Sequence, residues 1–185
     1  MDFLNSIILL TNFIIVPGIT YGSQLALGAI GVTLIYGVLR FANFAYGDLM
    51  AFGTMIVILV TWFLQSKGIT FGLLPTALLA LPVGILLTIA VSLFFDKTVF
   101  EYYRNKKSDP VTFIVVSLGI MFVLNAVVRI IIGPNDINFM DGHKFIMKAR
   151  EFKQMTGLNE GLALKSTHVI TIITTINTCS ILFYF

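Results

Sequence analysis

The stretch LRFANFAYGDLM, residues 39–50, sets four polar side chains into a chain that is otherwise strongly apolar. They are Arg40, Asn43, Tyr46 and Asp48: a cation, an amide, a phenol and a carboxylate. A carboxylate inside a membrane span costs about 2.5–3.5 kcal/mol on insertion scales, so such a residue normally faces protein or a water-filled cavity. The first question is therefore whether lipid is the solvent for this chain.

Composition answers that question. The 185 residues are 57% hydrophobic and 11% charged, whereas soluble domains have about 45–50% apolar and about 25% charged residues. The net charge of +3 is scattered, without the basic run that marks nucleic-acid binding. One cysteine excludes an intrachain disulfide, two distant histidines suggest no metal site, and no nucleophile–base constellation indicates catalysis. The composition indicates a membrane protein that is not an enzyme.

Apolar runs follow one another along the chain. The five longest cover residues 19–38, 49–65, 69–95, 110–133 and 167–185. A shorter run is predicted to be a half-span, or a tilted helix, that ends at Pro17-Gly18. None alternates as the strands of a membrane β-barrel do, so the backbone must be satisfied within helices. We predict an all-α fold: one transmembrane helical bundle over residues 1–185, with about five to six membrane segments and a helix break near residues 41–48.

Two polar connections flank the 110–133 span and therefore lie on opposite sides of the membrane. The density of basic residues favours 96–109 as the cytoplasmic loop, although the two basic totals are nearly equal. In the longer connection, 134–166, the segment 144–155 has apolar residues at helical spacing with basic residues between them. We predict a short helix on the bilayer surface there, with a docking surface for a partner protein as the alternative.

The first clear span carries a stripe of small residues at spacings of four, four, three, four and four. The stripe consists of Gly18, Gly22, Ala26, Ala29, Thr33 and Gly37. On a helix these residues share one face, and small side chains let helix backbones approach closely in lipid. We predict that this helix packs in the centre of the bundle.

The opening stretch has features of a helix break. Asn43 and Gly47 tolerate unusual backbone conformations, and Asp48 is a natural N-cap for a helix that starts at Leu49. A plain interhelical turn would leave Asp48 as a cap alone, whereas a break at membrane depth would line a cavity. The aromatic residues make this turn very apolar, so we favour the cavity. The candidate residues of a substrate pathway are Asn43, Phe44, Tyr46, Gly47 and Asp48.

Three other polar residues lie towards the ends of spans. Arg40 ends the first span, and its long side chain can snorkel to the membrane interface. Asn125 and Arg129 lie one turn apart, late in the 110–133 span. They can cap its interface end, or Asn125 can bond across to another helix. We assign Arg40 and Arg129 to topology and the membrane interface.

Residues 22–53, GSQLALGAIGVTLIYGVLRFANFAYGDLMAFG, resemble the signature region of the membrane permease subunits of branched-chain amino-acid ABC importers. That family typically has a small-residue helix ending in TLIYGV-x-R, then an NFAHGE-like segment and a new helix. A second block is also similar: FEYYRNKKSDP to the family's basic cytoplasmic loop, and SLGIMFVLNAVVRIIIGP to the span that follows it. The likeness runs in order from about residue 18 to residue 135.

The resemblance implies a permease subunit of an ATP-driven importer for branched-chain or other small amino acids, working by alternating access in the bacterial inner (cytoplasmic) membrane. The implied partners are a second permease subunit, cytoplasmic ATPase subunits that use ATP, and an external solute-binding protein. This chain would bind no cofactor. The family places 96–109 in the cytoplasm and 134–166 outside. Members continue past a span like 167–185 into a coupling loop, so the chain resembles an N-terminal portion, from a truncated or split gene.

Two residues depart from the family pattern. Tyr46 stands where the family usually has His, and Asp48 where it usually has Glu. Tyrosine keeps a hydrogen-bonding tip but does not titrate near neutral pH, and aspartate keeps the carboxylate on a shorter arm. Because permeases for urea and short amides carry similar segments, that substrate class stays open. Three other possibilities also stay open: a non-functional fragment and, from another class of protein, a passive channel or a membrane anchor.

Overall fold

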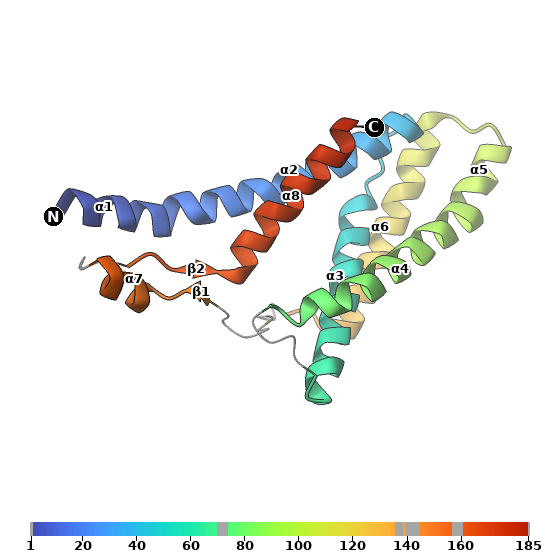
Figure 1. Ribbon diagram of the computed structural model, residues 1–185. Helices are drawn as coiled ribbons and strands as arrows, with labels where there is room; N and C mark the ends of the chain where they lie inside the picture. The colour runs from blue at the N-terminus through green and yellow to red at the C-terminus, as the bar shows by residue number, and fades with distance from the viewer. Residues whose placement is uncertain (1, 70–73, 136–138, 140–144, 157–160, 185) are drawn as a thin grey trace. The chain divides into compact units, whose positions relative to one another are not determined.

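The structure, a computed structural model, describes residues 2–69, 74–135, 139, 145–156 and 161–184, and these residues are mainly helical (Figure 1). The helices are α1 (Asp2–Leu10), the π-helix η1 (Thr11–Ile15), α2 (Val16–Leu39), α3 (Tyr46–Ser66), α4 (Ala77–Phe95), the π-helix η2 (Asp96–Phe100), α5 (Glu101–Asn105), α6 (Pro110–Ile132), α7 (Ala149–Thr156) and α8 (Ser166–Tyr184). Two short strands, β1 (Phe145–Met147) and β2 (Leu164–Lys165), pair antiparallel. The prediction of an all-α fold is confirmed.

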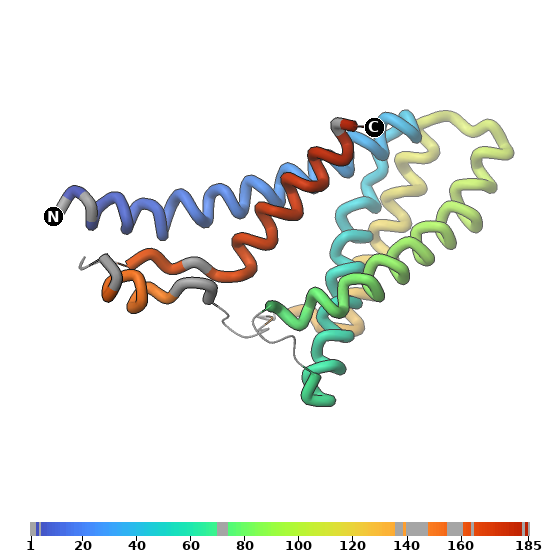
Figure 2. The backbone as a smooth tube through the Cα atoms, in the orientation of Figure 1, coloured from blue at the N-terminus to red at the C-terminus, as the bar shows by residue number. Residues whose placement is uncertain are grey.

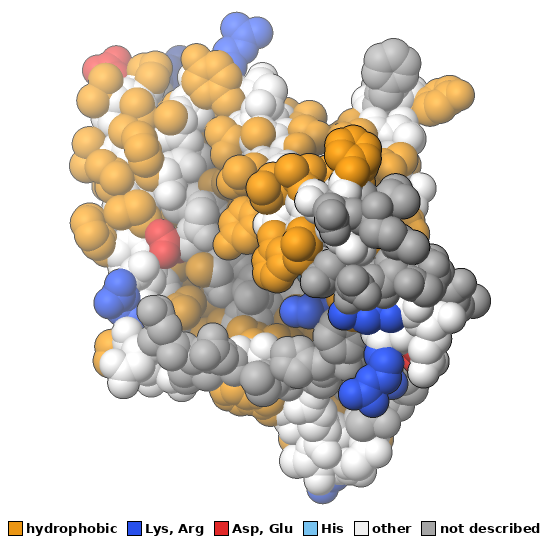
Figure 3. Space-filling model, turned by 90° about the vertical axis from the view of Figure 1, so that its left-hand side faces the viewer, with side chains coloured by type: hydrophobic (Ala, Val, Ile, Leu, Met, Phe, Trp, Pro, Cys, Tyr) orange, Lys and Arg blue, Asp and Glu red, His pale blue; other side chains and the backbone are white. Residues whose placement is uncertain are grey.

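Four helices are long and apolar enough to cross a membrane. They cover Asn5–Leu39, Tyr46–Ser66, Ala77–Asn105 and Pro110–Ile132, and Ser166–Leu182 is a shorter apolar helix. Many large apolar side chains on these helices are exposed, and orange apolar atoms spread over much of the described surface in Figure 3. An exposed apolar surface of this extent fits lipid as the solvent. The chain is a multi-pass membrane protein.

The first membrane helix is longer than predicted. It runs through Pro17 and Gly18 without ending (Figure 2), so the prediction of a half-span or tilted helix that ends there is wrong. The reason lies one turn earlier, in η1, where the N–H of Val16 donates to the carbonyl of Thr11, five residues back. A π-helical turn of this kind absorbs the disturbance that a proline causes inside a helix.

The later helices also differ in their bounds. α4 begins just after Pro75 and continues past Pro82. Helical structure then extends through η2 and α5, so the polar segment predicted as a loop over 96–109 is helical as far as Asn105. α6 begins at Pro110 in the first helical position, as predicted, because a residue at that position needs no backbone N–H. Within 144–155, a helix is present only from Ala149 onwards. Its place on the bilayer surface stays a prediction.

Contacts divide the chain into two units, described separately. One contains Met1–Gly31, Gly72–Pro75 and Gly142–Phe185, and the other Val32–Phe71 and Thr76–Asp141. In the first unit, the Asn12 side chain of η1 donates to the carbonyl of Gly161 and accepts from the N–H of Ala163. The Thr175 hydroxyl of α8 contacts the carbonyl of Ser23, at 3.5 Å.

The second unit holds α3, α4 and α6, and glycines bring α3 and α4 together. A Cβ placed on Gly53 would lie 2.7 Å from the Thr88 hydroxyl, and one on Gly84 would collide with Val57. Small residues thus permit close backbone approach here, as expected for helices in lipid. By contrast, a Cβ built on Gly18, Gly22 or Gly37 would meet no described atom within 4 Å apart from its chain neighbours and the nearby backbone of its own helix. The packing role of that stripe stays a prediction.

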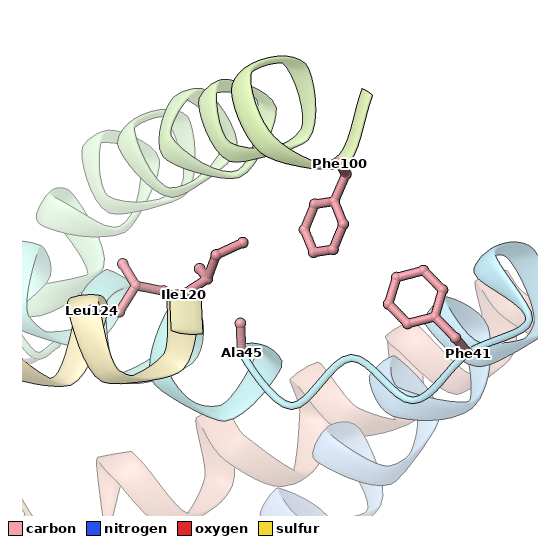
Figure 4. Close-up of a cluster of buried hydrophobic side chains, with 5 residues drawn as sticks. All are labelled: Phe41, Ala45, Phe100, Ile120 and Leu124. Atoms are coloured by element: carbon pink, nitrogen blue, oxygen red, sulfur yellow. The ribbon is translucent and has the colours of Figure 1, made fainter. Parts of the chain in front are cut away.

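The core of the second unit forms where the helix break meets α6. Its buried members are Phe41, Ala45, Phe100, Ile120 and Leu124 (Figure 4). Phe41 and Ala45 come from the break, Phe100 from η2, and Ile120 and Leu124 from one face of α6. The break is therefore a packed part of the protein rather than a solvated turn.

Candidate functional site

The break starts at Arg40, immediately after α2 ends. The N–H of Arg40 donates to the carbonyl of Tyr36 at 2.8 Å, and Arg40 has a φ of 57°. Such a left-handed residue with a bond to the carbonyl four residues earlier is a common helix C-terminal cap, usually formed by Gly or Asn. Unusual backbone was expected at Asn43 and Gly47 instead. That expectation fails for Gly47, which lies inside α3.

Three backbone donors at the end of the break, where α3 begins, have acceptors. The N–H of Phe44 donates to the Ser117 hydroxyl at 3.2 Å, and the N–H of Ala45 donates to the Asn43 side-chain oxygen at 3.1 Å. The N–H of Tyr46 lies 3.4 Å from the Asn43 carbonyl oxygen. An unsatisfied backbone group in hydrocarbon costs several kcal/mol, so these acceptors are what make a break in a membrane helix tolerable. Ser117 is 0% exposed. The acceptor for the Phe44 N–H is therefore a buried protein side chain and not bulk water.

These contacts correct the assignment of the helix start. α3 begins at Tyr46, with Ala45 as the N-cap residue and no side-chain cap bond from it. Asp48 therefore lies in the first turn, and the prediction that it caps a helix from Leu49 is wrong. The physical reason is that the Asn43 side chain already accepts from Ala45, which orders the chain before Asp48 is reached. The negative charge of Asp48 in the first turn still favours the helix dipole.

The break lies beside the first part of α6, and the first turn of α3 lies beside its later part. Phe41 stacks on Phe113 with ring centroids 5.2 Å apart, Phe44 bonds to Ser117, and Asp48 bonds to Asn125. Later residues of the break thus meet later residues of α6, so α3 runs in the same direction as α6. Asn125 lies about 22 Å from the first residue of α6, at about 1.5 Å per residue. A helix break near residues 41–48 was predicted, and it is confirmed. Its place at membrane depth stays a prediction.

Asp48, Asn125 and Arg129 form one polar chain. The Asn125 amide nitrogen donates to Asp48 Oδ1 at 3.0 Å, and Arg129 Nε donates to the Asn125 amide oxygen at 2.8 Å. Only this orientation of the amide is consistent, because a carboxylate only accepts and a guanidinium only donates. The amide thereby links an anion and a cation, and this lowers the cost of holding Asp48 in the membrane. Of the two roles left open for Asn125, the structure shows the cross-helix bond.

The other candidate residues are less closely grouped. Asn43 lines a cavity of about 380 Å³, together with Ala45 and Leu49 and with apolar residues of α4, η2 and α6. Phe44 is 51% exposed. Tyr46 is half-buried and Gly47 is exposed, both in the first turn of α3. In the described part of the chain, no group of three or more His, Cys, Asp or Glu residues is placed to hold a metal ion.

Sequence reasoning missed Ser117 as a functional residue. It is a small polar residue at the start of the SLG motif and at helical spacing from Ile120 and Leu124, all three of which are buried. The signal that could have identified it is a hydroxyl on the most apolar face of a membrane helix. Such a hydroxyl needs a partner, and a nearby helix break supplies donors.

Comparison with known proteins gives consistent results. Residues 14–183 match the model of a family described as "Branched-chain amino acid transport system / permease component". The chain is 30% identical over 121 residues to the high-affinity branched-chain amino acid transport system permease protein LivH of Escherichia coli K12, covering 65% of this chain and 38% of LivH. To LivH of Salmonella typhimurium LT2 the chain is 28% identical over 121 residues, which again cover 65% of this chain and 38% of the relative.

A third relative is the corresponding permease protein BraD of Pseudomonas aeruginosa PAO1. It is 38% identical over 55 residues, or 30% of this chain and 18% of BraD. The chain therefore spans well under half the length of the curated relatives that it matches. No solved structure matches significantly.

Proposed function

Because this chain belongs to the family of permease components of the branched-chain amino acid transport system, we propose that it forms part of the pathway by which a small amino acid crosses the membrane. The relatives LivH and BraD are high-affinity branched-chain amino acid permeases by name. This similarity favours leucine, isoleucine and valine as the substrate class.

The observation that carries the proposal is the helix break packed against α6, followed by the polar chain of Asp48, Asn125 and Arg129. Broken helices at membrane depth are the usual place for solute sites in transporters. The Asp48 carboxylate and the Arg129 guanidinium are complementary in charge to the ammonium and the carboxylate of an α-amino acid. The mainly apolar cavity beside Asn43 suits an aliphatic side chain.

Transport by this arrangement requires two states that differ in their contacts. The Asp48–Asn125 bond joins α3 to α6 in the state described here. A solute shifts the equilibrium between states only by the difference in its affinity for them. We infer that the polar chain exchanges partners with the solute, so that its binding favours a different arrangement of α3 and α6.

The full system would contain further subunits. In this proposal a second permease subunit completes the pathway, cytoplasmic ATPase subunits hydrolyse ATP, and an external solute-binding protein delivers the amino acid. The chain itself binds no cofactor. It lies in the bacterial inner membrane, with 96–109 on the cytoplasmic side and 134–166 outside.

The test is uptake of radiolabelled leucine by cells of the source organism that lack the gene. Uptake is expected to fall on deletion, and to return with the wild-type gene and with Glu101→Gln, which removes an exposed carboxylate at the end of the bundle. Asp48→Ala and the milder Asp48→Asn are expected not to restore uptake when the proteins reach the membrane in equal amounts, measured by immunoblot.

Other outcomes point elsewhere. Unchanged leucine uptake in the deletion strain would refute the amino-acid proposal, and a loss of urea or acetamide uptake instead would favour a short-amide permease. Leucine uptake that persists after depletion of cellular ATP would indicate a passive channel.

A further inference from the structure

A second cavity, of about 300 Å³, lies where α2 ends beside the start of α6. Its lining combines an apolar wall of three phenylalanines with two arginines and one aspartate. These residues are Phe41, Phe100, Phe113, Arg40, Arg104 and Asp96. The three rings pack on one another, with centroid separations of 5.2–6.4 Å. The cavity is thus a fixed apolar surface with charged groups at one place.

The charges in this cavity do not cancel. Arg104 Nη2 donates to both carboxylate oxygens of Asp96 at 3.0 Å, which neutralises one arginine and leaves its Nε and Nη1 without hydrogen bonds in the described residues. The guanidinium of Arg40 has no hydrogen-bond or ion-pair partner within the described part of the chain. Two cations and one anion leave the cavity with one uncompensated positive charge. The ion pair is about half exposed, at 51% for Arg104 and 47% for Asp96.

Backbone geometry indicates that Arg40 is present for its side chain. Its left-handed φ of 57° is one that Gly or Asn adopts with less strain. The bond from its N–H to Tyr36 caps α2 and would form with glycine as well. The cap therefore does not explain an arginine at this position.

Neighbouring residues place this end of the bundle at a membrane surface. Tyr102 and Tyr103 pack edge to face on α5, and the Lys106 ammonium lies 4.5 Å from the Tyr102 ring centroid. Tyrosines and cations at the ends of membrane helices are typical of the headgroup region. Lys97 and Lys107 lie in the same segment, where the basic residues outnumber the acidic Asp96, Glu101 and Asp109 by one. A net positive charge next to the headgroups attracts anionic lipids.

We propose that this cavity binds the headgroup of an anionic phospholipid. The phosphodiester, with one negative charge, lies between Arg40 and the remaining donors of Arg104, because guanidinium groups suit phosphate oxygens. The adjoining acyl chain lies along Val38, which is 81% exposed, and the phenylalanine wall. This cavity shares Val38, Leu39, Asp96 and Phe100 with the cavity beside Asn43, but it contains no residue of the polar chain at Asp48. The proposal does not depend on the proposed transport function.

The experiment measures lipid retention by native mass spectrometry. The purified full chain is incubated with equal amounts of phosphatidylglycerol and phosphatidylcholine, and the ratio of bound lipids is measured. The wild type is expected to retain more phosphatidylglycerol. Arg40→Gly, which relaxes the backbone, is expected to lower that retention about fivefold. Lys67→Gln removes a cation at the C-terminal end of α3, away from the cavity, and is expected to leave the retention of phosphatidylglycerol unchanged.

A gain of binding provides the second measurement. Asp96→Asn releases Arg104 and raises the charge of the cavity by one, so retention of phosphatidylglycerol is expected to increase. An unfolded variant would not produce such an increase. Equal retention of both lipids by the wild type would overturn the proposal and favour an acidic segment of a partner protein as the occupant. An Arg40→Gly variant that retains as much as the wild type would also overturn it, as would displacement by equimolar inorganic phosphate.

Discussion

Replacing Asn125 with Leu tests the polar link between α3 and α6. Leucine has the same branching at Cγ as asparagine, so the shape of the side chain on α6 is largely kept, but both hydrogen bonds of the amide are lost. The half-buried Asp48 carboxylate then lacks its donor from α6, and Arg129 loses the acceptor of its Nε. Removing one partner of a buried charged group costs more than the bond itself contributes, because the charge is left without compensation.

The expected magnitude follows from the two bonds. Hydrogen bonds between membrane helices average about 0.6 kcal/mol and reach about 1.7 kcal/mol. The bond between Asn125 and Asp48 involves a charge and is partly buried, so it belongs near the upper value. The bond from Arg129 is exposed and adds a few tenths of a kcal/mol. Together they predict that Asn125→Leu lowers the free energy of unfolding by about 2 kcal/mol.

The assay is unfolding of the purified chain in mixed detergent micelles, by titration with sodium dodecyl sulfate. Asp48→Leu and the double variant Asn125→Leu with Asp48→Leu complete a double-mutant cycle. In the double variant no carboxylate is left without a donor, so its loss of stability is expected to be about 1 kcal/mol smaller than the sum of the two single losses. Additive effects within about 0.5 kcal/mol, or an unaffected Asn125→Leu variant, would refute the reasoning.

Four other substitutions test the break and the helix packing by the same unfolding assay. Ser117→Ala removes the acceptor for a backbone donor of the break and is expected to cost about 1–3 kcal/mol. Gly84→Ala drives a Cβ into Val57 and is expected to cost about 1–3 kcal/mol, whereas Gly28→Ala, with open space around its Cα, is expected to be neutral or stabilising by up to about 1 kcal/mol. Arg40→Gly is expected to raise stability by about 1 kcal/mol, because a left-handed backbone costs a non-glycine residue about that much; a loss of stability would contradict the strain.

The break and the spans around it could be predicted because solvation alone places them. Long apolar runs must cross the membrane as helices, and the polar residues Asn43 and Asp48 could enter it only with partners. Pro110 could be assigned to the start of α6 from its own chemistry, since it lacks an N–H. In each case the structure follows from the chemistry of the residue itself or from its solvation by lipid or water.

Other features depend on partners that are distant in sequence. Asn125 and Arg129 are visibly one turn apart, but Asp48 lies 77 positions from Asn125. The N-cap role of Asp48 looked favourable only while the contacts of Asn43 and Ser117 were unknown. Residue propensity alone predicts a helix start at Leu49. In the structure, with these tertiary contacts formed, the helix starts at Tyr46.

Packing by small residues shows the same limit. The stripe that begins at Gly18 is conspicuous because its members share one helix. The close contact found in the structure depends on Gly53 of α3 and Gly84 of α4, one residue from each helix. A pattern within one helix shows that the helix can be approached closely, but the identity of the approaching helix is a property of the pair. The π-turn η1 is equally invisible, because Pro17 by itself predicts an end.

An amide between two charges suits a solute pathway better than a direct ion pair. Two charges 4 Å apart attract by about 4 kcal/mol at an effective dielectric constant of about 20, and a passing solute would have to replace all of that. In the polar chain, Asp48 and Arg129 are each held to Asn125 by a single hydrogen bond, worth about 1–2 kcal/mol or less in a membrane protein. An ammonium or a carboxylate of a solute can compete with one such bond. In the proposed pathway, Asn125 would therefore keep the charges compensated at rest and still available for exchange.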